Sequence, residues 1–534
     1  MSSSRSKAGE PAPERRRQAP ERTTMNQRAM TRRTALRILG LTAAAAGLRT
    51  GAPAAAAPTG EVKIGLAAEP NTFDPHLTVG RNTQIFIANV YDGLTARDVQ
   101  GNLVPALAES WKRLNATTWQ FALRKGVKFH NGDDFNAECV KFTLDRATNP
   151  ETKATISSEV STIGGAEIVD PFTVNVITRT PDFLLPVRLG ELFGLMLSPK
   201  HTNATGKEAI AVKPNGTGPF KLVTWAKNER LVLEANENYW RGSPKVKTIV
   251  VRPILEDAAR VAALQAGEVD LIAPIPHVRI AELQKNDKLV IKTIAAPRIF
   301  HVTIDVRKPP FDNVKVRQAL NYAVDVNAIL KTLYFGHGTR LATVVDKGAL
   351  GYDPSVAPYP YDPSKAKALL AEAGYPNGFE VEFDSFTGSI ADHSKPAEAI
   401  VGYLQKVGIR AKANVFEFSA LGPRRVQNKT APLFIYSIGN AYLEPSWVIR
   451  WMTQGGLGMH YKNARLDELL TRIEATDDPK KRAPQYSDVQ KLIKDEAPFI
   501  FLYQADAAFG MSARVDYTPR PDETQWLYPL ALKG

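Results

Sequence analysis

Histidines are the commonest protein ligands for transition metals, and the eight in this 534-residue chain are widely separated. None forms the HxxxH or HExxH spacing that places two imidazoles on one face of a helix. A protein-built metal site is therefore not expected, although distant histidines could still converge in space. They are His76, His130, His201, His277, His301, His337, His393 and His460.

The loops that hold phosphates or dinucleotides are also incomplete. Residues 216–221 begin like a dinucleotide loop, but Lys221 stands where the third glycine belongs and Pro219 would disturb the start of a helix. Residues 205–208 lack the Ser/Thr of a phosphate loop, and no GxSxG elbow occurs. Because no nucleophile is paired with a base, we expect a protein that is not an enzyme and carries no cofactor.

Cys139 is the only cysteine. It excludes an intramolecular disulfide, a CxxC redox pair and any zinc site built from several cysteines. The thiol could be reactive or could fill a core as a small apolar group. Its place on a short predicted helix, with no histidine close in sequence, favours the buried alternative.

The net charge of +13 is concentrated in the first segment of the chain. Residues 1–57 hold eleven Lys/Arg and three acidic residues, a net charge of +8, which leaves +5 for residues 58–534. With 44% hydrophobic and 23% charged residues the chain has an ordinary globular composition. We therefore expect no nucleic-acid partner.

Residues 1–57 have the layout of an export signal. A basic stretch precedes the apolar run at residues 38–48, and small residues follow at 54–57. The run is far shorter than the ~20 residues that span a bilayer, which predicts a signal cleaved near residues 54–58. Residues 31–37 resemble the twin-arginine motif, but Ala35 replaces its usual aromatic, so the general export route stays open.

The rest of the chain alternates between strand and helix patterns. Residues 62–66 alternate as a strand and lead into a turn-rich loop at 69–75, and residues 118–124 form a strand with one buried face. Asn136 can cap a helix, and Asp362 can cap another that ends at Gly374. This order predicts α/β lobes, and the lack of a second apolar span predicts a soluble mature protein.

Seven ordered blocks carry a specific resemblance. The chain is similar to bacterial solute-binding protein family 5, the extracytoplasmic receptors of dipeptide, oligopeptide and nickel ABC importers. The resemblance covers nearly all of residues 60–510. Its blocks are residues 103–111, 119–132, 136–138, 216–220, 238–242, 264–270 and 310–320.

This resemblance implies a periplasmic-binding-protein-like, two-lobe (Venus flytrap) α/β fold with an extra domain inserted in the first lobe. Lobe I would comprise residues 58–80, 200–297 and 500–534, the inserted domain residues 81–199, and lobe II residues 298–499. Crossover strands are expected near residues 295–300 and 495–505, where Pro297 and Pro498 mark hinges or simply end neighbouring elements.

The implied function is a periplasmic receptor that captures a peptide or peptide-like solute between its lobes and delivers it to an ABC permease in the inner membrane. We expect a monomer. An opine, a sugar conjugate or a nickel chelate bound at His460 or His393 remains an alternative ligand. An exported folding helper or a ligand sensor with the same fold is an alternative function.

The residues expected to contact the ligand come from both lobes. Dipeptide receptors carry an Asp that pairs with the peptide ammonium, but the similar segment here, residues 437–447, has no Asp and places Glu444 before its proline. The ammonium contact is therefore in doubt. The predicted cleft residues are Asn71 and Phe73 from the first lobe, and Phe386, Thr387, Asn440, Tyr442 and Trp447 from the second.

Overall fold

The computed structural model describes residues 57–78, 81–156, 159–387, 393–453, 460–522 and 524–533. Residues 55–534 form one compact unit. The predicted export signal lies outside the described residues, apart from Ala57. No helix in the described ranges is long and apolar enough to cross a membrane.

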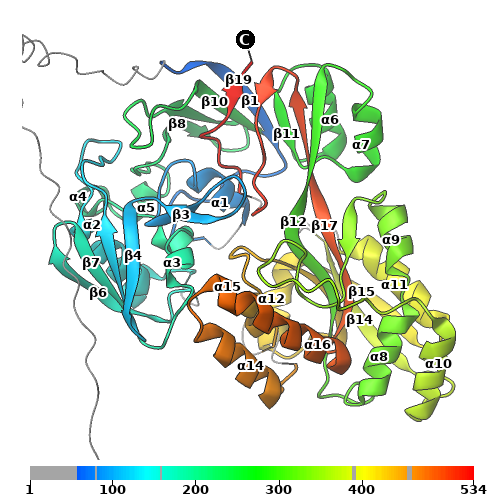
Figure 1. Ribbon diagram of the computed structural model, residues 1–534. Helices are drawn as coiled ribbons and strands as arrows, with labels where there is room; N and C mark the ends of the chain where they lie inside the picture. The colour runs from blue at the N-terminus through cyan, green and yellow to red at the C-terminus, as the bar shows by residue number, and fades with distance from the viewer. Residues whose placement is uncertain are drawn as a thin grey trace, which may run out of the picture. The chain divides into compact units, whose positions relative to one another are not determined.

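A large mixed sheet runs through the described part of the chain in the order β15-β14-β16-β12-β17-β11-β1-β10-β9-β8, with β13 also paired to β17. Its strands are β1 (Thr59–Leu66), β8 (Phe220–Ala226), β9 (Arg230–Ala235), β10 (Val246–Pro253), β11 (Leu271–Ala273), β12 (Leu289–Ile304), β13 (Gly338–Arg340), β14 (Glu380–Thr387), β15 (Arg410–Glu417), β16 (Leu433–Gly439) and β17 (Phe499–Ser512). Figure 1 shows β12 and β17 side by side, connecting the two halves of this sheet. We call the half with β11, β1, β10, β9 and β8 the first lobe and the half with β16, β14 and β15 the second lobe.

A separate sheet has the order β4-β5-β7-β6. It comprises β4 (Ala108–Asn115), β5 (Thr118–Leu123), β6 (Ile163–Asp170) and β7 (Thr173–Thr178), and it packs on α2 (Ala137–Thr148). Asn136 caps α2 by accepting from the backbone N–H groups of Glu138 and Cys139, as its sequence predicts. We call residues 94–196, which share one hydrophobic core, the small-sheet region; in sequence it lies between β1 and β8.

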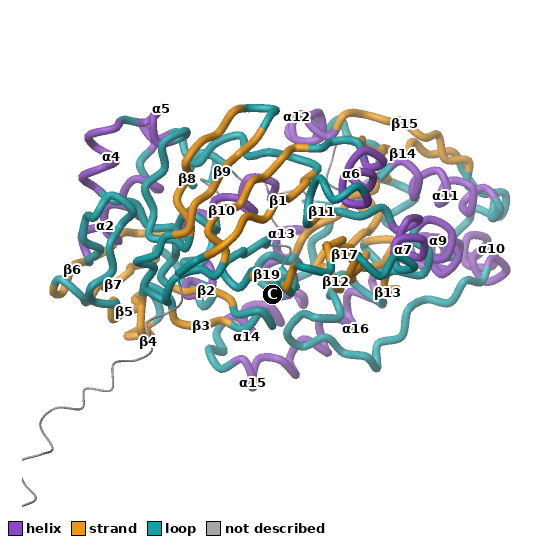
Figure 2. The backbone as a smooth tube through the Cα atoms, turned by 90° about the horizontal axis from the view of Figure 1, so that it is seen from above, coloured by secondary structure: helices purple, strands orange, loops and turns teal. Residues whose placement is uncertain are grey.

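Helices cover the second lobe. In Figure 2, α9, α10 and α11 gather beside the end of the sheet that carries β14 and β15. The second-lobe helices are α8 (Val314–Ala323), α9 (Val326–Leu333), α10 (Pro363–Glu372), α11 (Ser394–Gln405), α12 (Leu421–Val426), α13 (Pro445–Thr453), α14 (Ala464–Glu474), α15 (Pro479–Arg482) and α16 (Tyr486–Glu496).

The remaining short elements belong to the first lobe and the small-sheet region. They are α1 (Arg81–Ile87), β2 (Thr95–Arg97), β3 (Leu103–Pro105), α3 (Leu185–Arg188), α4 (Pro199–Thr205), α5 (Lys207–Ile210), α6 (Asp257–Gln265), α7 (His277–Leu283), β18 (Val515–Asp516) and β19 (Ala531–Leu532).

Cys139 belongs to the core of the small-sheet region, where it packs with Phe135, Val140 and Leu144. Burial raises the pKa of its thiol to about 11, so the thiol stays protonated at neutral pH. The buried alternative for Cys139 is the one that the structure supports.

The crossover strands are irregular where they pass between the lobes. Ala295 of β12 pairs with Asp506 of β17, and the next pair is Ile299 with Gln504, so β12 carries extra residues around Pro297. A bulge of this kind bends a strand and increases its twist. The crossover predicted at residues 295–300 therefore lies within β12, whereas the limits of the lobes and of the inserted domain stay predictions.

Candidate functional site

The segment that follows β16 reaches from the second lobe to the small-sheet region. The Arg97 guanidinium donates through Nη2 to the carbonyl oxygen of Tyr442 at 2.5 Å. The Tyr442 hydroxyl donates to Glu159 Oε2, also at 2.5 Å. Both ends of Tyr442 are thus held by residues more than 280 positions earlier in the chain.

Burial dominates the electrostatics at Tyr442. It raises the pKa of the phenol well above its ordinary value, and the Glu159 charge raises it further, so the hydroxyl remains a donor at all physiological pH values. Arg188 lies close by and forms a buried ion pair with Asp182. Burial alone would lower the pKa of Arg188, but Asp182, Tyr442 and Glu159 outweigh it and the pKa is raised.

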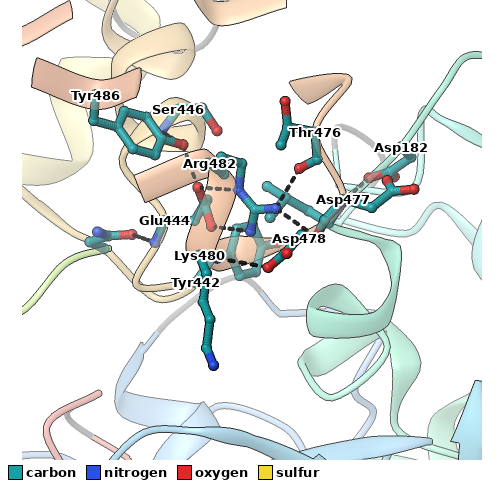
Figure 3. Close-up of polar contacts among 12 residues, drawn as sticks. Asp182, Tyr442, Glu444, Ser446, Thr476, Asp477, Asp478, Lys480, Arg482 and Tyr486 are labelled. Carbon is teal, nitrogen blue, oxygen red and sulfur yellow. Dashed lines mark hydrogen bonds and ion pairs between the residues drawn. The ribbon is translucent and has the colours of Figure 1, made fainter. Parts of the chain in front are cut away.

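Glu444, two residues beyond Tyr442, is held inside the second lobe. Arg482 donates to both of its carboxylate oxygens, from Nη2 to Oε2 at 2.9 Å and from Nε to Oε1 at 3.2 Å, and the Tyr486 hydroxyl donates to Oε1 (Figure 3). The Glu444 and Arg482 side chains are 6% and 7% exposed. Because its oxygens are already occupied, Glu444 has little capacity to bind a ligand ammonium.

Two more contacts bridge the same junction. Arg113 of β4 forms a 2.5 Å ion pair with Asp477, and the Arg482 guanidinium lies 4.8 Å from the ring centroid of Phe183. Arg482 also donates through Nη1 to the carbonyl oxygens of Thr476 and Asp477 at 2.8 and 3.0 Å. The bridging contacts therefore come from the 440–444 segment, from the loop between α14 and α15, and from Arg482 at the end of α15.

Three buried polar side chains lie where the crossover strands meet the second lobe. Asn440 donates through Nδ2 to Asp346 Oδ1 at 2.9 Å, and its backbone N–H donates to the carbonyl of Pro297 at 2.6 Å. Gln504 of β17 donates through Nε2 to the carbonyl of Ala296 and accepts from the N–H of Lys347 at 3.0 Å. Asp346, Asn440 and Gln504 are each at most 1% exposed.

A row of aromatic rings extends from Tyr442 into the second lobe. Tyr442 meets Trp447 edge to face at 4.8 Å, Trp447 stacks with Trp451 at 6.5 Å, and Trp451 stacks with Tyr436 at 5.8 Å. Phe418 continues the row, 6.1 Å from Tyr436. Trp447 is only half-buried, so part of its indole is exposed to solvent.

The other predicted contacts lie in the cores or on the surface of the two lobes, and Phe386 meets Phe418 of the aromatic row edge to face at 6.4 Å. Phe73 is fully buried in the first-lobe core, where it packs edge to face on Trp225, and Asn71 is exposed and bonded to Thr83. Phe386 is fully buried with Leu421 and Phe434, and Thr387 donates to Glu417 Oε1 at 3.2 Å. The structure brings Asn440, Tyr442 and Trp447 together in one region. The ligand roles of all seven residues stay predictions, and the side chains of Phe73 and Phe386 have packing roles.

The residues of the junction that sequence reasoning missed are Arg97, Glu159, Asp346 and Arg482. Each lies far in sequence from the 440–447 segment, and none belongs to a local motif. His460 and His393 each have a polar neighbour: His460 Nδ1 accepts from Arg307 at 2.9 Å, and His393 Nε2 lies 3.0 Å from Ser437 Oγ. No group of three His, Cys, Asp or Glu side chains within the described ranges is arranged to hold a metal ion.

A small cavity of about 50 Å³ lies beside Arg97 and is lined also by Gln84, Glu191, Arg241 and Trp526. It takes no residue from the second lobe, and it is far smaller than the 300–1,000 Å³ typical of sites for small organic ligands.

The mixed sheet shared by two lobes, the paired crossover strands and the polar contacts that bridge the junction define a two-lobe binding protein of the α/β class. The chain belongs to the bacterial extracellular solute-binding proteins, family 5, whose model matches residues 102–458. The resemblance found in the sequence blocks is thereby confirmed.

Individual relatives agree with this assignment. The chain is 32% identical over 466 residues to the glutathione-binding protein GsiB of Pectobacterium atrosepticum, covering 84% of this chain and 90% of the relative. The periplasmic binding protein DppA of Helicobacter pylori, solved with the peptide STSA, superposes with a TM-score of 0.79 at 25% identity, covering 89% and 98% of the two chains. AgaA of A. tumefaciens R10, solved with agropinic acid, has a TM-score of 0.76 at 25% identity, covering 89% and 99%.

Proposed function

We propose that this protein is the periplasmic solute receptor of an ABC importer, which encloses a peptide-like solute between its two lobes and presents it to a membrane permease. The observation that carries the proposal is the junction at Tyr442, where the second lobe bonds directly to Arg97 and Glu159. A solute that contacts both sides of such a junction stabilises the closed arrangement by its differential affinity for that arrangement. The permease then recognises the closed arrangement of the receptor.

A small peptide with a free amine, such as glutathione, is the solute class that we favour. Relatives at 32% identity over most of both chains are glutathione-binding proteins, and a structural neighbour holds a short peptide. The aromatic row from Tyr442 to Phe418 offers apolar surface for side chains. Peptide backbone groups would bond to the chain at the ends of β14 and β16.

An opine is the second candidate, supported by the likeness to AgaA with agropinic acid. Like a peptide, an opine is built on an amino acid and carries a carboxylate, so both candidates need charged partners within the cleft. Export through the twin-arginine route, cleavage near residues 54–58 and a monomeric receptor complete the proposal.

Isothermal titration calorimetry on the chain from residue 58 onward tests this function. The panel is glutathione, Met-Leu, the tetrapeptide STSA, agropinic acid and a nickel–histidine complex. We expect saturable one-to-one binding to one chemical class and a rise in melting temperature that grows with the concentration of that ligand. Equal weak responses to the whole panel, together with tight binding of an unfolded protein such as reduced lactalbumin, would instead support the folding-helper alternative.

A further inference from the structure

Asp346 is a buried carboxylate with one oxygen left without a donor. It lies in the loop between β13 and α10 and is 0% exposed. Oδ1 accepts from Asn440 Nδ2 at 2.9 Å, whereas Oδ2 has no hydrogen-bond partner within the described structure. Buried polar atoms are nearly always paired, so an unpaired carboxylate oxygen indicates a missing partner.

No positive charge among the described residues offsets the burial of Asp346. Burial raises the pKa of Asp346 to about 6, and the influences that oppose burial are hydrogen bonds from Asn440 and from its own backbone, not a positive charge. Isolation of this kind makes the ionised form unfavourable in the closed protein. A cation with N–H donors would supply both the charge and the hydrogen bond that Oδ2 lacks.

The position of Asp346 puts it within reach of the site. The neighbouring Lys347 N–H bonds to Gln504 on crossover strand β17, and the Leu350 N–H bonds to the Leu443 carbonyl at 3.3 Å. Asn440, which holds Asp346, is two residues from Tyr442 and is bonded to the bulge at Pro297. Asp346 therefore lies where the crossover strands meet the second lobe.

The other acids of this junction are already engaged. Glu444 accepts from Arg482 and Tyr486, and Glu159 accepts from Tyr442 and lies close enough to Arg188 to raise the pKa of its guanidinium. Asp346 differs from both in that its side chain is 0% exposed and one of its oxygens has no donor among the described residues.

We propose that Asp346 binds the protonated amine of the solute, with Asn440 as the positioning residue that fixes its carboxylate. The inference rests on the proposed receptor function and narrows its solute class to compounds with a free primary or secondary amine. The ion pair forms in a buried site, where a charge-assisted hydrogen bond is stronger than one exposed to water.

The test compares free and blocked amines. Glutathione and Met-Leu are titrated into the wild-type chain alongside their N-acetylated forms, which remove the charge and leave the rest of each molecule in place. We expect the free amines to bind at least tenfold more tightly at pH 7, and Asp346→Asn to abolish that preference. Asp353→Asn, in the same loop, is the matched control and should keep it, because Asp353 is bonded to Ser355 and Ser487.

Contrary results separate the two proposals. If a free amine and its N-acetyl form bind wild type equally, or if Asp346→Asn retains the preference, the role of Asp346 is overturned while the receptor function stands. The comparison on wild type needs no variant, so it holds even if Asp346→Asn fails to fold. If wild type binds nothing in the panel, the receptor function fails and the inference fails with it.

Discussion

The hydroxyl of Tyr442 donates a 2.5 Å hydrogen bond to the carboxylate of Glu159, a residue 283 positions earlier in the chain. The bond joins the second lobe to the small-sheet region. A hydrogen bond to a charged acceptor contributes about 1.5–3 kcal/mol. This one is partly buried and exists only while the two sides are in contact. It therefore stabilises the closed arrangement even before a solute contributes.

Tyr442→Phe should shift the ligand-free protein toward the open arrangement. The variant loses the hydroxyl and leaves Glu159 without that donor, so the closing equilibrium should fall roughly tenfold or more. Small-angle X-ray scattering of wild type and variant measures the change as a larger radius of gyration.

Tyr528→Phe is the control for this variant, because the Tyr528 hydroxyl donates to the carbonyl of Arg241 without reaching the second lobe. Its radius of gyration should match that of wild type. A Tyr442→Phe variant with an unchanged radius would show that the Glu159 contact does not influence closure.

Trp447→Ala should weaken solute binding more than it lowers the melting temperature. Trp447 is half-buried and forms the part of the aromatic row next to Tyr442, so its removal leaves fewer apolar contacts for a bound solute. Trp225→Ala is the matched control: this half-buried indole packs on Phe73 in the first lobe and should lower stability without changing affinity. Calorimetry that gives equal dissociation constants for wild type and Trp447→Ala would remove Trp447 from the site.

Arg482→Met should lower the free energy of unfolding by about 3–5 kcal/mol, because it leaves the buried Glu444 carboxylate without its cation. The double variant Arg482→Met with Glu444→Leu should recover most of that loss, since both charges are then absent. Arg113→Met removes a bridging pair whose Asp477 side chain is 49% exposed, and it should change stability by at most about 1 kcal/mol. Urea unfolding measures all three; a single variant as stable as wild type would mean that Glu444 is hydrated or protonated.

Local features of the fold were predictable from sequence. The cap at Asn136 and the alternating burial of Trp119, Phe121 and Leu123 depend on residues a few positions apart, and the structure confirms both. The cap at Asp362, which accepts from the Lys365 N–H, is confirmed in the same way. Short-range hydrogen bonds and hydrophobic periodicity are visible in the order of residues alone.

The junction was only partly predictable. Asn440, Tyr442 and Trp447 were predicted because residues 437–447 resemble the segment of dipeptide receptors that carries the ammonium-binding Asp. Their partners Glu159 and Asp346 come from distant loops with no shared spacing. The aromatic residues Phe73 and Phe386 lie in buried clusters, because proximity to a strand end does not determine which face a ring occupies. Which side chains meet across the lobes depends on the tertiary structure. The spacing of residues in a single sequence does not reveal it.

Asp346 should make the protein less stable as the pH rises. Its pKa is raised from an ordinary 3.8 to about 6, so between these values the folded state retains a proton that the unfolded state has released. The free energy of unfolding should therefore decrease from pH 4 to pH 6 and then level off, by about 3 kcal/mol in total for a shift of two pKa units. Asp346→Asn removes this dependence and should be the more stable protein at pH 7, with no advantage at pH 4.

Urea unfolding between pH 4 and pH 8 measures the difference in the free energy of unfolding between wild type and Asp346→Asn. The contributions of the other titrating groups cancel in this difference. Asp353→Asn is the control, because the contribution of Asp353 to stability changes with pH in the opposite direction to that of Asp346. The hydroxyls of Ser355 and Ser487 lower the pKa of Asp353 to about 2, so its contribution to stability is present above pH 4 and is lost as the pH falls toward 2. Its removal should lower stability at pH 7. If the difference between Asp346→Asn and wild type does not vary with pH, Asp346 is not the isolated buried acid that the ligand site requires.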